Sequence, residues 1–218
     1  MNLGPILLIG GGGHCVSCIE ALESAGWNIA GIIDRREQIG LKVLEYEVIG
    51  GDEDLPILVS EINYALVTVG QLVDPGLRMR LYNKARMAGF KLPPIVASGA
   101  QVSQHASLGA GTVVLHGATI NASASVGENV IVNSGAIVEH EAVINDHCHI
   151  STGAIVNGGC RIGEGCFVGS GSVLLNGVKV GDRVVIGAGA VVVSDLLEAG
   201  TYIGCPARIL KVPEGDRA

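Results

Sequence analysis

The sequence predicts two structural units, an α/β layer with a parallel sheet and, after it, a parallel β-helix built from six-residue repeats. Strand and helix patterns alternate over the first 95 residues, which is typical of an α/β layer. From Val96 to Val192 every sixth residue is Val, Leu or Ile, without a gap. The 218 residues include 33 Gly, yet only 3% are aromatic, as expected where thin aliphatic layers fill the core. We therefore divide the chain into an α/β domain at 1–94, a β-helix at 95–193 and a tail at 194–218.

The composition excludes several classes of function. The chain carries 14 Lys and Arg against 21 Asp and Glu, a net charge of −7, so we expect no nucleic-acid partner. No apolar run is long enough to span a membrane, and the apolar stretch at 5–13 lacks the basic start of a secretory signal. The six Cys fit no metal-ligand spacing, and we interpret Cys15 and Cys18 as small residues of a helix. The sequence therefore predicts a cytoplasmic protein with reduced thiols and no metal.

Each element of the α/β domain has its own signal. Strands are predicted at 6–9, 27–33, 48–49 and 65–69, and helices at 16–24, 52–62 and 74–89. Gly26 is placed to end the first helix. The third helix is expected to have Asp74 as its cap and Pro75 at its first position. Pro93 and Pro94 mark the junction with the repeats.

A glycine-rich loop, Gly10 to Gly13, lies between the first strand and the first helix, and His14 follows it. In a Rossmann-like layer this position lets a phosphate approach the backbone N–H groups of a helix N-terminus. Asp34 ends the second strand about 20 residues later, where a ribose partner is expected. Cys15, however, stands at the third glycine position of a dinucleotide fingerprint. We favour a nucleotide-phosphate site over a ligand-free turn, and both over an NAD site.

The six-residue period is the signature of a β-helix. It matches neither the period of an α-helix nor the simple alternation of a strand. A small residue usually stands four positions after each aliphatic one. We expect the aliphatic side chain to point inward and the small one to let the chain turn at the next corner. Cys148, Cys160 and Cys166 occupy this small position, so they are predicted to pack in the core.

His140 is the candidate catalytic group of the repeat. It is expected to point outward near a corner, between Glu139 and Glu141, and a neighbouring carboxylate orients an imidazole and raises its basicity. In a coil of 18 residues Gly158 would lie above His140, and the missing side chain is predicted to leave space for a substrate or thioester. The alternative is that His140 and His149 are solvated surface histidines. Three further histidines are expected on the surface: His105, His116 and His147.

Four motifs occur in order along the chain: GGGGH at 10–14, VEHE at 138–141, CHIS at 148–151 and GCPAR at 204–208. With the repeats, they resemble the hexapeptide family that includes bacterial nucleotide-amino-sugar N-acetyltransferases of the bacillosamine and perosamine pathways and sialic acid O-acetyltransferases. The resemblance implies a left-handed parallel β-helix, a homotrimer, and acetyl-CoA bound in the groove between neighbouring helices. The left hand follows from the resemblance alone, because most parallel crossovers are right-handed.

The resemblance also implies residue roles. His140 would be the general base, Glu141 would raise its basicity, and Asn133 would lie near the substrate amine. The nucleotide sugar would contact Gly11, Gly12, Gly13, His14, Asp34, Arg35 and Gly70. Acetyl-CoA would contact His149 and Gly158, which would hold the acetyl carbonyl, and Ser170 and Ala188, which would contact the pantetheine. Arg35 departs from the acidic or small residue of many relatives, so the base or sugar preference is open.

The expected reaction is acetyl transfer from acetyl-CoA to an amine of a nucleotide-linked 4-amino-6-deoxysugar, by direct attack with His140 as general base. One alternative is O-acetylation of a sialic acid with the same machinery. A second alternative is a non-catalytic trimeric protein that binds a sugar. The sequence does not separate the first two.

Overall fold

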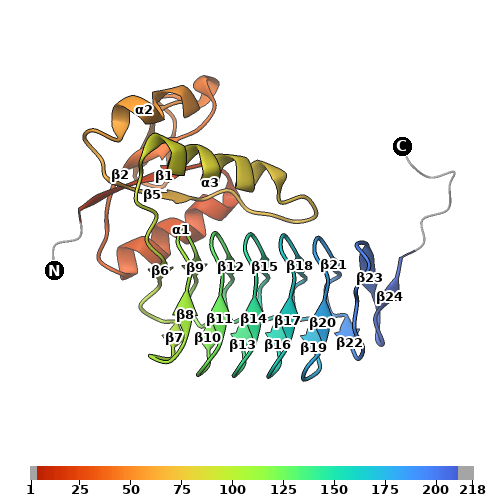
Figure 1. Ribbon diagram of the computed structural model, residues 1–218. Helices are drawn as coiled ribbons and strands as arrows, with labels where there is room; N and C mark the ends of the chain where they lie inside the picture. Colours follow the sequence, from red (N-terminus) through yellow and green to blue (C-terminus); the bar gives the residue numbers. More distant parts are fainter. Residues whose placement is uncertain (1–3, 211–218) are drawn as a thin grey trace, which may run out of the picture.

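The computed structural model describes residues 4–210. Figure 1 shows the α/β layer seated against the N-terminal coils of the β-helix, with α1 lying between the sheet and those coils. Both predicted kinds of fold are present. The last part of the predicted tail, 211–218, lies outside the described residues.

The α/β layer contains a five-stranded sheet in the order β3-β4-β2-β1-β5. Its strands are β1 (Pro5–Ile9), β2 (Asn28–Ile33), β3 (Lys42–Val43), β4 (Tyr46–Gly50) and β5 (Tyr64–Val67). β1 pairs in parallel with β2 and β5. Its residues 6–9 are apolar and fully buried, because helices or the β-helix cover both faces of a central parallel strand. The strand predicted at 48–49 is part of β4, whereas β3, which pairs antiparallel with β4, was not predicted.

Three helices connect these strands: α1 (Gly13–Ser24), α2 (Leu55–Leu58) and α3 (Gly76–Ala88). Short 3-10 turns occupy Arg36–Gln38 and Asp52–Asp54. The helix predicted at 52–62 is therefore wrong except at α2, because the Asp54 carboxylate accepts the Gly51 N–H at 2.8 Å and holds a tighter turn. α3 begins at Gly76 rather than at 74, and Asp74 Oδ1 accepts the Gly76 N–H at 2.9 Å.

The β-helix consists of two-residue strands in three parallel sheets, named here after one strand of each. The β15 sheet contains β6 (Ile95–Val96), β9 (Val113–Val114), β12 (Ile131–Val132), β15 (His149–Ile150), β18 (Phe167–Val168) and β21 (Val185–Ile186). The β13 sheet contains β7 (Gln101–Val102), β10 (Thr119–Ile120), β13 (Ile137–Val138), β16 (Ile155–Val156), β19 (Val173–Leu174) and β22 (Val191–Val192). The β14 sheet contains β8 (Ser107–Leu108), β11 (Ser125–Val126), β14 (Val143–Ile144), β17 (Arg161–Ile162) and β20 (Lys179–Val180).

The period of the sequence gives the register of these sheets. Ile131 pairs with His149 and Val132 with Ile150, so equivalent residues lie 18 positions apart. The second residue of each strand is the predicted aliphatic one, and together these residues form a continuous buried core. Cys148, Cys160 and Cys166 lie in the same core, as predicted.

The C-terminal coil is closed by a hairpin. β23 (Thr201–Ile203) continues the β15 sheet in parallel, and β24 (Arg208–Ile209) turns back antiparallel to it. Tyr202 and Ala207 are buried there and end the core, as a solenoid requires at its last repeat. Within residues 4–210 no helix is both long enough and apolar enough to cross a membrane.

Candidate active site

A cavity of about 1080 Å³ opens where the carboxyl ends of β1, β2 and β5 meet the N-terminus of α1. The carboxyl edge of a parallel sheet is the usual ligand-binding edge of this kind of layer. Six of the predicted substrate-binding residues line the cavity together: Gly12, Gly13, His14, Asp34, Arg35 and Gly70. His149 of the β-helix lines it too, so the cavity joins the two units of the chain.

Gly11 and Asp34 fix the shape of the glycine loop. The Gly11 N–H donates to Asp34 Oδ2 at 2.5 Å, and the Arg35 N–H donates to Asp34 Oδ1 at 2.7 Å. Gly10 has φ +110°, and a Cβ at this position would lie 2.3 Å from Val69 Cγ2, so the loop requires glycine here. Asp34 therefore holds the loop in addition to facing the cavity.

The N-terminus of α1 faces the cavity without a capping side chain from any residue in 4–210. A Cβ added at Gly12 or Gly13 would meet nothing within 4 Å, so open space adjoins their N–H groups. Unpaired N–H groups at a helix N-terminus favour an anion. This geometry supports the predicted phosphate site.

His149 is buried and uncharged at the side of the cavity formed by the β-helix. Its Nδ1 lies 2.7 Å from the Gln71 carbonyl oxygen, so Nδ1 carries the proton and donates it. The Ser134 N–H donates to Asn133 Oδ1 at 2.7 Å, which orients the amide, and Asn133 Nδ2 donates to His149 Nε2 at 3.0 Å. Burial lowers the pKa of His149 to about 4. Both ring nitrogens are engaged within the chain, so the expected contact from His149 to the acetyl carbonyl is not available in this geometry.

His14 stands beside His149, with 6.2 Å between the ring centroids. Burial lowers the pKa of His14 to about 3, and the positive charge of Arg78 contributes. Gly70 leaves room for this side chain, because a Cβ on Gly70 would lie 3.4 Å from His14 Cβ. The cavity therefore contains two neutral imidazoles.

His140 lies at the turn between β13 and β14 and is mostly exposed, as predicted. Its Nδ1 is 3.3 Å from Glu141 Oε2, a contact that orients the ring. A Cβ on Gly158 would lie 2.7 Å from His140 Nε2 and 2.6 Å from Cε1. The space predicted above His140 is therefore present, but the imidazole itself lies in it.

Glu139 does not share this role. Asn121 Nδ2, on the preceding coil, donates to Glu139 Oε2 at 2.7 Å. Of the two glutamates beside His140, only Glu141 contacts the ring among the described contacts.

The predicted site residues fall into separate groups on one chain. His140 is absent from the cavity lining, because it follows the β13 sheet, whereas His149 of the lining belongs to the β15 sheet. Figure 1 shows the α/β layer on the side of the β15 sheet. Asn133 contacts His149 rather than His140. Ser170 and Ala188 lie in turns after β18 and β21, away from the turn of His140 and Gly158.

The prediction that His147 lies on the surface is wrong. Its side chain is 9% exposed, its Nδ1 lies 2.9 Å from Asn129 Nδ2, and its ring packs edge-on against Tyr82. The reason is tertiary, because α3 covers this corner of the β-helix. His105 is exposed and His116 is half-buried.

Several residues of the cavity carried no recognisable signal in the sequence. The Gln71 backbone oxygen accepts the hydrogen bond from the His149 Nδ1–H, and the Gln71 side chain donates to the Gly165 carbonyl at 3.2 Å. Others line the cavity as well: Arg36, Glu37, Asp52, Glu53, Thr68, Leu72, Leu77 and Leu81. The part of the chain that the structure describes has no group of three or more His, Cys, Asp or Glu placed to hold a metal ion.

Comparison with known families agrees with both units. Residues 5–85 match the PglD N-terminal domain, and residues 159–194 match the bacterial transferase hexapeptide repeats. A comparison with curated protein sequences gave no significant match.

Solved structures resemble nearly the whole chain. Perosamine N-acetyltransferase from Caulobacter crescentus, in complex with CoA and GDP-perosamine, is 35% identical with a TM-score of 0.90, over 96% of this chain and 98% of that chain. The chain belongs to the hexapeptide acetyltransferases that carry a PglD N-terminal domain. The acetyltransferase domain of PglB from Neisseria gonorrhoeae, with acetyl coenzyme A, is 34% identical with a TM-score of 0.88, over 95% of this chain and 100% of that chain. This acetyltransferase accordingly has a left-handed parallel β-helix.

Proposed function

We propose that this acetyltransferase transfers the acetyl group of acetyl-CoA to the amino group of a nucleotide-linked 4-amino-6-deoxysugar. The observation that carries the proposal is the combination of a phosphate-compatible cavity in the α/β layer with an oriented, exposed imidazole on the β-helix. The similar enzyme from Caulobacter crescentus has GDP-perosamine bound, which supports the choice of an amino sugar.

His140 supplies the general base of this reaction. Its Nδ1–H donates to Glu141, so Nε2 has a free lone pair that accepts a proton as the amine nitrogen attacks the thioester carbonyl. The C–N bond forms, the C–S bond breaks, and CoA leaves as the thiol with the proton that His140 received. The three cysteines of the repeat are buried in the core, so none of them is placed to form an acyl-cysteine. The acetyl group therefore passes directly to the amine.

The Gly158 backbone is the candidate oxyanion donor. Its N–H makes no hydrogen bond with the described chain, although its carbonyl accepts the Gly177 N–H at 2.9 Å. The His140 ring lies on the side of Gly158 where a Cβ would stand, so this backbone adjoins the proposed base. A preorganised backbone donor at this place would stabilise the tetrahedral intermediate.

A homotrimer completes the site in this proposal. On the outward face of the β13 sheet, next to the His140 turn, half-buried aliphatic side chains form a stripe: Ile137, Ile155, Val173 and Val191. Packing of this face against another copy would bring His140 of one chain to the cavity of its neighbour, and Gly158 to the Ser170 and Ala188 turns. Acetyl-CoA would then lie between two β-helices.

The test is acceptor-dependent release of the CoA thiol from acetyl-CoA. The acceptor panel contains UDP-, GDP- and dTDP-linked 4-amino-6-deoxysugars, with CMP-sialic acid and free sialic acid beside them. Turnover on an amino sugar is the expected result and names the substrate. Turnover on a sialic acid alone would replace the proposal with O-acetylation.

A further inference from the structure

Arg78 is the largest fully buried side chain in residues 4–210, at 1% exposure. It projects from α3 into the junction between the α/β layer and the β-helix. Its Nη1 donates to the Asn129 backbone oxygen, while Nε and Nη2 have no hydrogen-bond partner within the described chain. A buried guanidinium normally has a carboxylate beside it, because burial of an uncompensated charge is strongly unfavourable.

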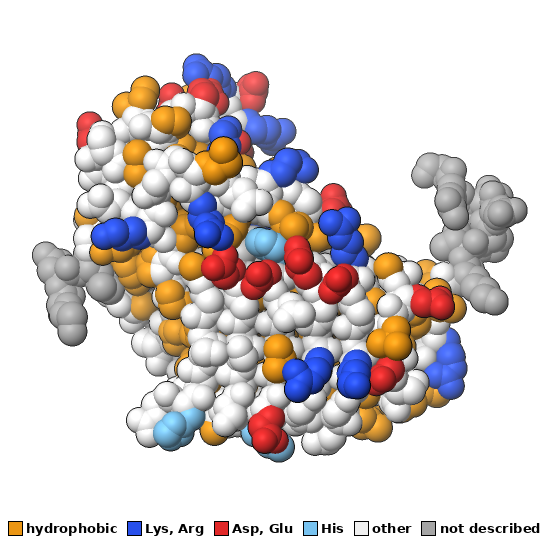
Figure 2. Space-filling model, in the orientation of Figure 1, with side chains coloured by type: hydrophobic (Ala, Val, Ile, Leu, Met, Phe, Trp, Pro, Cys, Tyr) orange, Lys and Arg blue, Asp and Glu red, His pale blue; other side chains and the backbone are white. Residues whose placement is uncertain are grey.

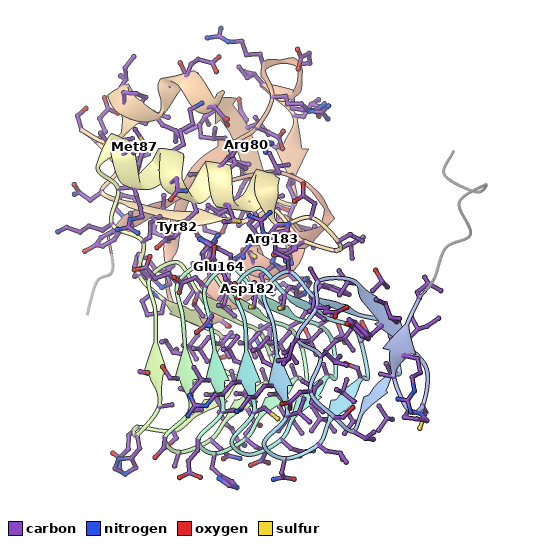
Figure 3. All side chains as sticks on the ribbon, turned by 45° about the vertical axis from the view of Figure 1, so that its right-hand side comes forward. Arg80, Tyr82, Met87, Glu164, Asp182 and Arg183 are labelled. Carbon is purple, nitrogen blue, oxygen red and sulfur yellow. The ribbon has the colours of Figure 1, made fainter. Side chains whose placement is uncertain are left out.

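No described carboxylate neutralises Arg78. Figure 2 shows a row of acidic side chains along the β-helix just below the α/β layer. Four acidic residues recur every 18 positions, Glu128, Asp146, Glu164 and Asp182, but each interaction found for them is with a group other than Arg78. Glu128 pairs with Arg86 at 2.8 Å, Asp146 accepts the Glu128 N–H, and Asp182 accepts the Glu164 N–H. Glu164 and Asp182 are labelled on the turns beneath α3 in Figure 3.

The groups that do face Arg78 are neutral. The thiols of Cys18 and Cys148 and the phenol of Tyr82 are close enough to interact with its charge, and burial raises the pKa of all three. The positive charge also helps to lower the pKa of His14 and His149. Both histidines line the cavity, as do Leu77 and Leu81 of α3, so Arg78 projects from a helix that forms part of the cavity wall.

Two further buried polar atoms without partners in the described chain lie in residues of the cavity wall. His14 Nε2 and Gln71 Oε1 are buried without a partner among residues 4–210, and both belong to residues that line the cavity. Bridging waters can link such acceptors to the Arg78 N–H groups, but neither water nor these acceptors supplies the missing negative charge.

We propose that Arg78 is the electrostatic partner of the diphosphate of the bound nucleotide sugar, acting through the cavity wall without touching the ligand. This inference rests on the proposed nucleotide-sugar substrate. A diphosphate at the Gly12–Gly13 N–H groups would place its negative charge in front of the enclosed positive charge. In a dry interior such a charge is weakly screened and acts over a longer distance than it would in water.

The experiment measures how the Arg78→Met variant binds ligands of increasing charge. The probes are GDP and UDP, the matching monophosphates and the matching nucleosides, measured by calorimetry or by competition. Binding of a diphosphate should weaken about tenfold, that of a monophosphate about threefold, and that of a nucleoside not at all. Arg78→Lys should retain most of the diphosphate affinity, because it keeps the charge.

Arg80→Met is the matched control. Arg80 is exposed on the same helix, and Figure 3 shows it on the side of α3 away from the β-helix. This variant should bind all probes normally, and thermal melting of both variants verifies that they are folded. An equal loss for diphosphate and nucleoside, or no loss for Arg78→Met, would overturn the proposal, as would wild-type protein that binds no diphosphate.

The readout does not depend on acetyl transfer. A charge-dependent loss of nucleotide binding with no turnover on any amino sugar would retain the role of Arg78 and reject the proposed reaction.

Discussion

His140 and Gly158 form the contact on which the proposed chemistry depends. Their spacing of 18 residues is readable from the sequence, and the structure confirms that they stack. The sequence could not show that the imidazole lies across the glycine, because the repeat pattern does not determine the side-chain rotamer of His140. The engagement of both nitrogens of His149 was equally hidden, since one partner is the Gln71 backbone and Gln71 belongs to no motif.

Gly158→Ala should displace the His140 ring, because the added Cβ would lie 2.6–2.7 Å from two ring atoms. We expect kcat to fall on the order of 100-fold with the fold retained. The control is Gly99→Ala, whose Cβ would approach His116 Nδ1 at 3.2 Å, far from the proposed chemistry. Equal activity of the two variants would contradict the stacked geometry.

His140→Ala removes the proposed base, so kcat should fall by roughly 10²–10⁴. His105→Ala removes an exposed histidine from another turn of the β-helix and should leave kcat unchanged. The acetyl-transfer assay compares both with the wild type. Near-normal turnover of His140→Ala would reject the general base.

Among the elements, the coils of the β-helix were predictable almost residue by residue, because each coil repeats the same aliphatic and small positions. The α/β layer was predictable in type but not in detail. The helix expected at 52–62 is mostly a 3-10 turn and a four-residue helix, since local hydrogen bonds of acidic residues decide its length. α3 was predicted, but its position against the β-helix was not, and that position buries His147.

Ile150 and Ile155 lie on consecutive strands of the β-helix, in different sheets. Their substitution distinguishes packing in the core from packing on the surface. Ile150 is fully buried, whereas Ile155 points outward on the β13 sheet. Ile150→Ala should lower the free energy of unfolding by about 2–5 kcal/mol. Ile155→Ala should lower the free energy of unfolding of the single chain by less than about 1 kcal/mol and should instead weaken assembly. Denaturant unfolding and ultracentrifugation measure the two effects, and similar losses of chain stability would contradict the inward and outward assignment.

At the scale of the whole molecule, two buried histidines at the junction between the two units make stability depend on pH. Burial lowers the pKa of His14 to about 3 and of His149 to about 4 from 6.5. Below about pH 6.5 the unfolded chain gains protons that the folded chain does not bind, so stability falls as the pH decreases toward 4. The slope from these two groups should approach roughly 2–3 kcal/mol per pH unit near pH 5. Urea unfolding across this range should show a shallower slope for the His14→Gln/His149→Gln variant, and an unchanged slope would contradict the assignment.

The resemblance assigned His140 and the cavity residues to one active site, but within a single chain they lie apart. The cavity and His140 belong to different faces, and a linear sequence cannot say which residues of a site come from a second copy. The proposed active site is therefore shared between neighbouring chains.

Subunit complementation tests this claim most directly. Gly12→Asp places a carboxylate at the phosphate site without a steric clash, so it should disable the cavity while leaving His140 intact. His140→Ala does the reverse. Each variant alone should be inactive, but trimers assembled from an equal mixture should recover roughly a quarter of wild-type activity, because a mixed trimer has one intact interface of its three. Activity of the mixture no higher than that of the separate variants would contradict a shared active site.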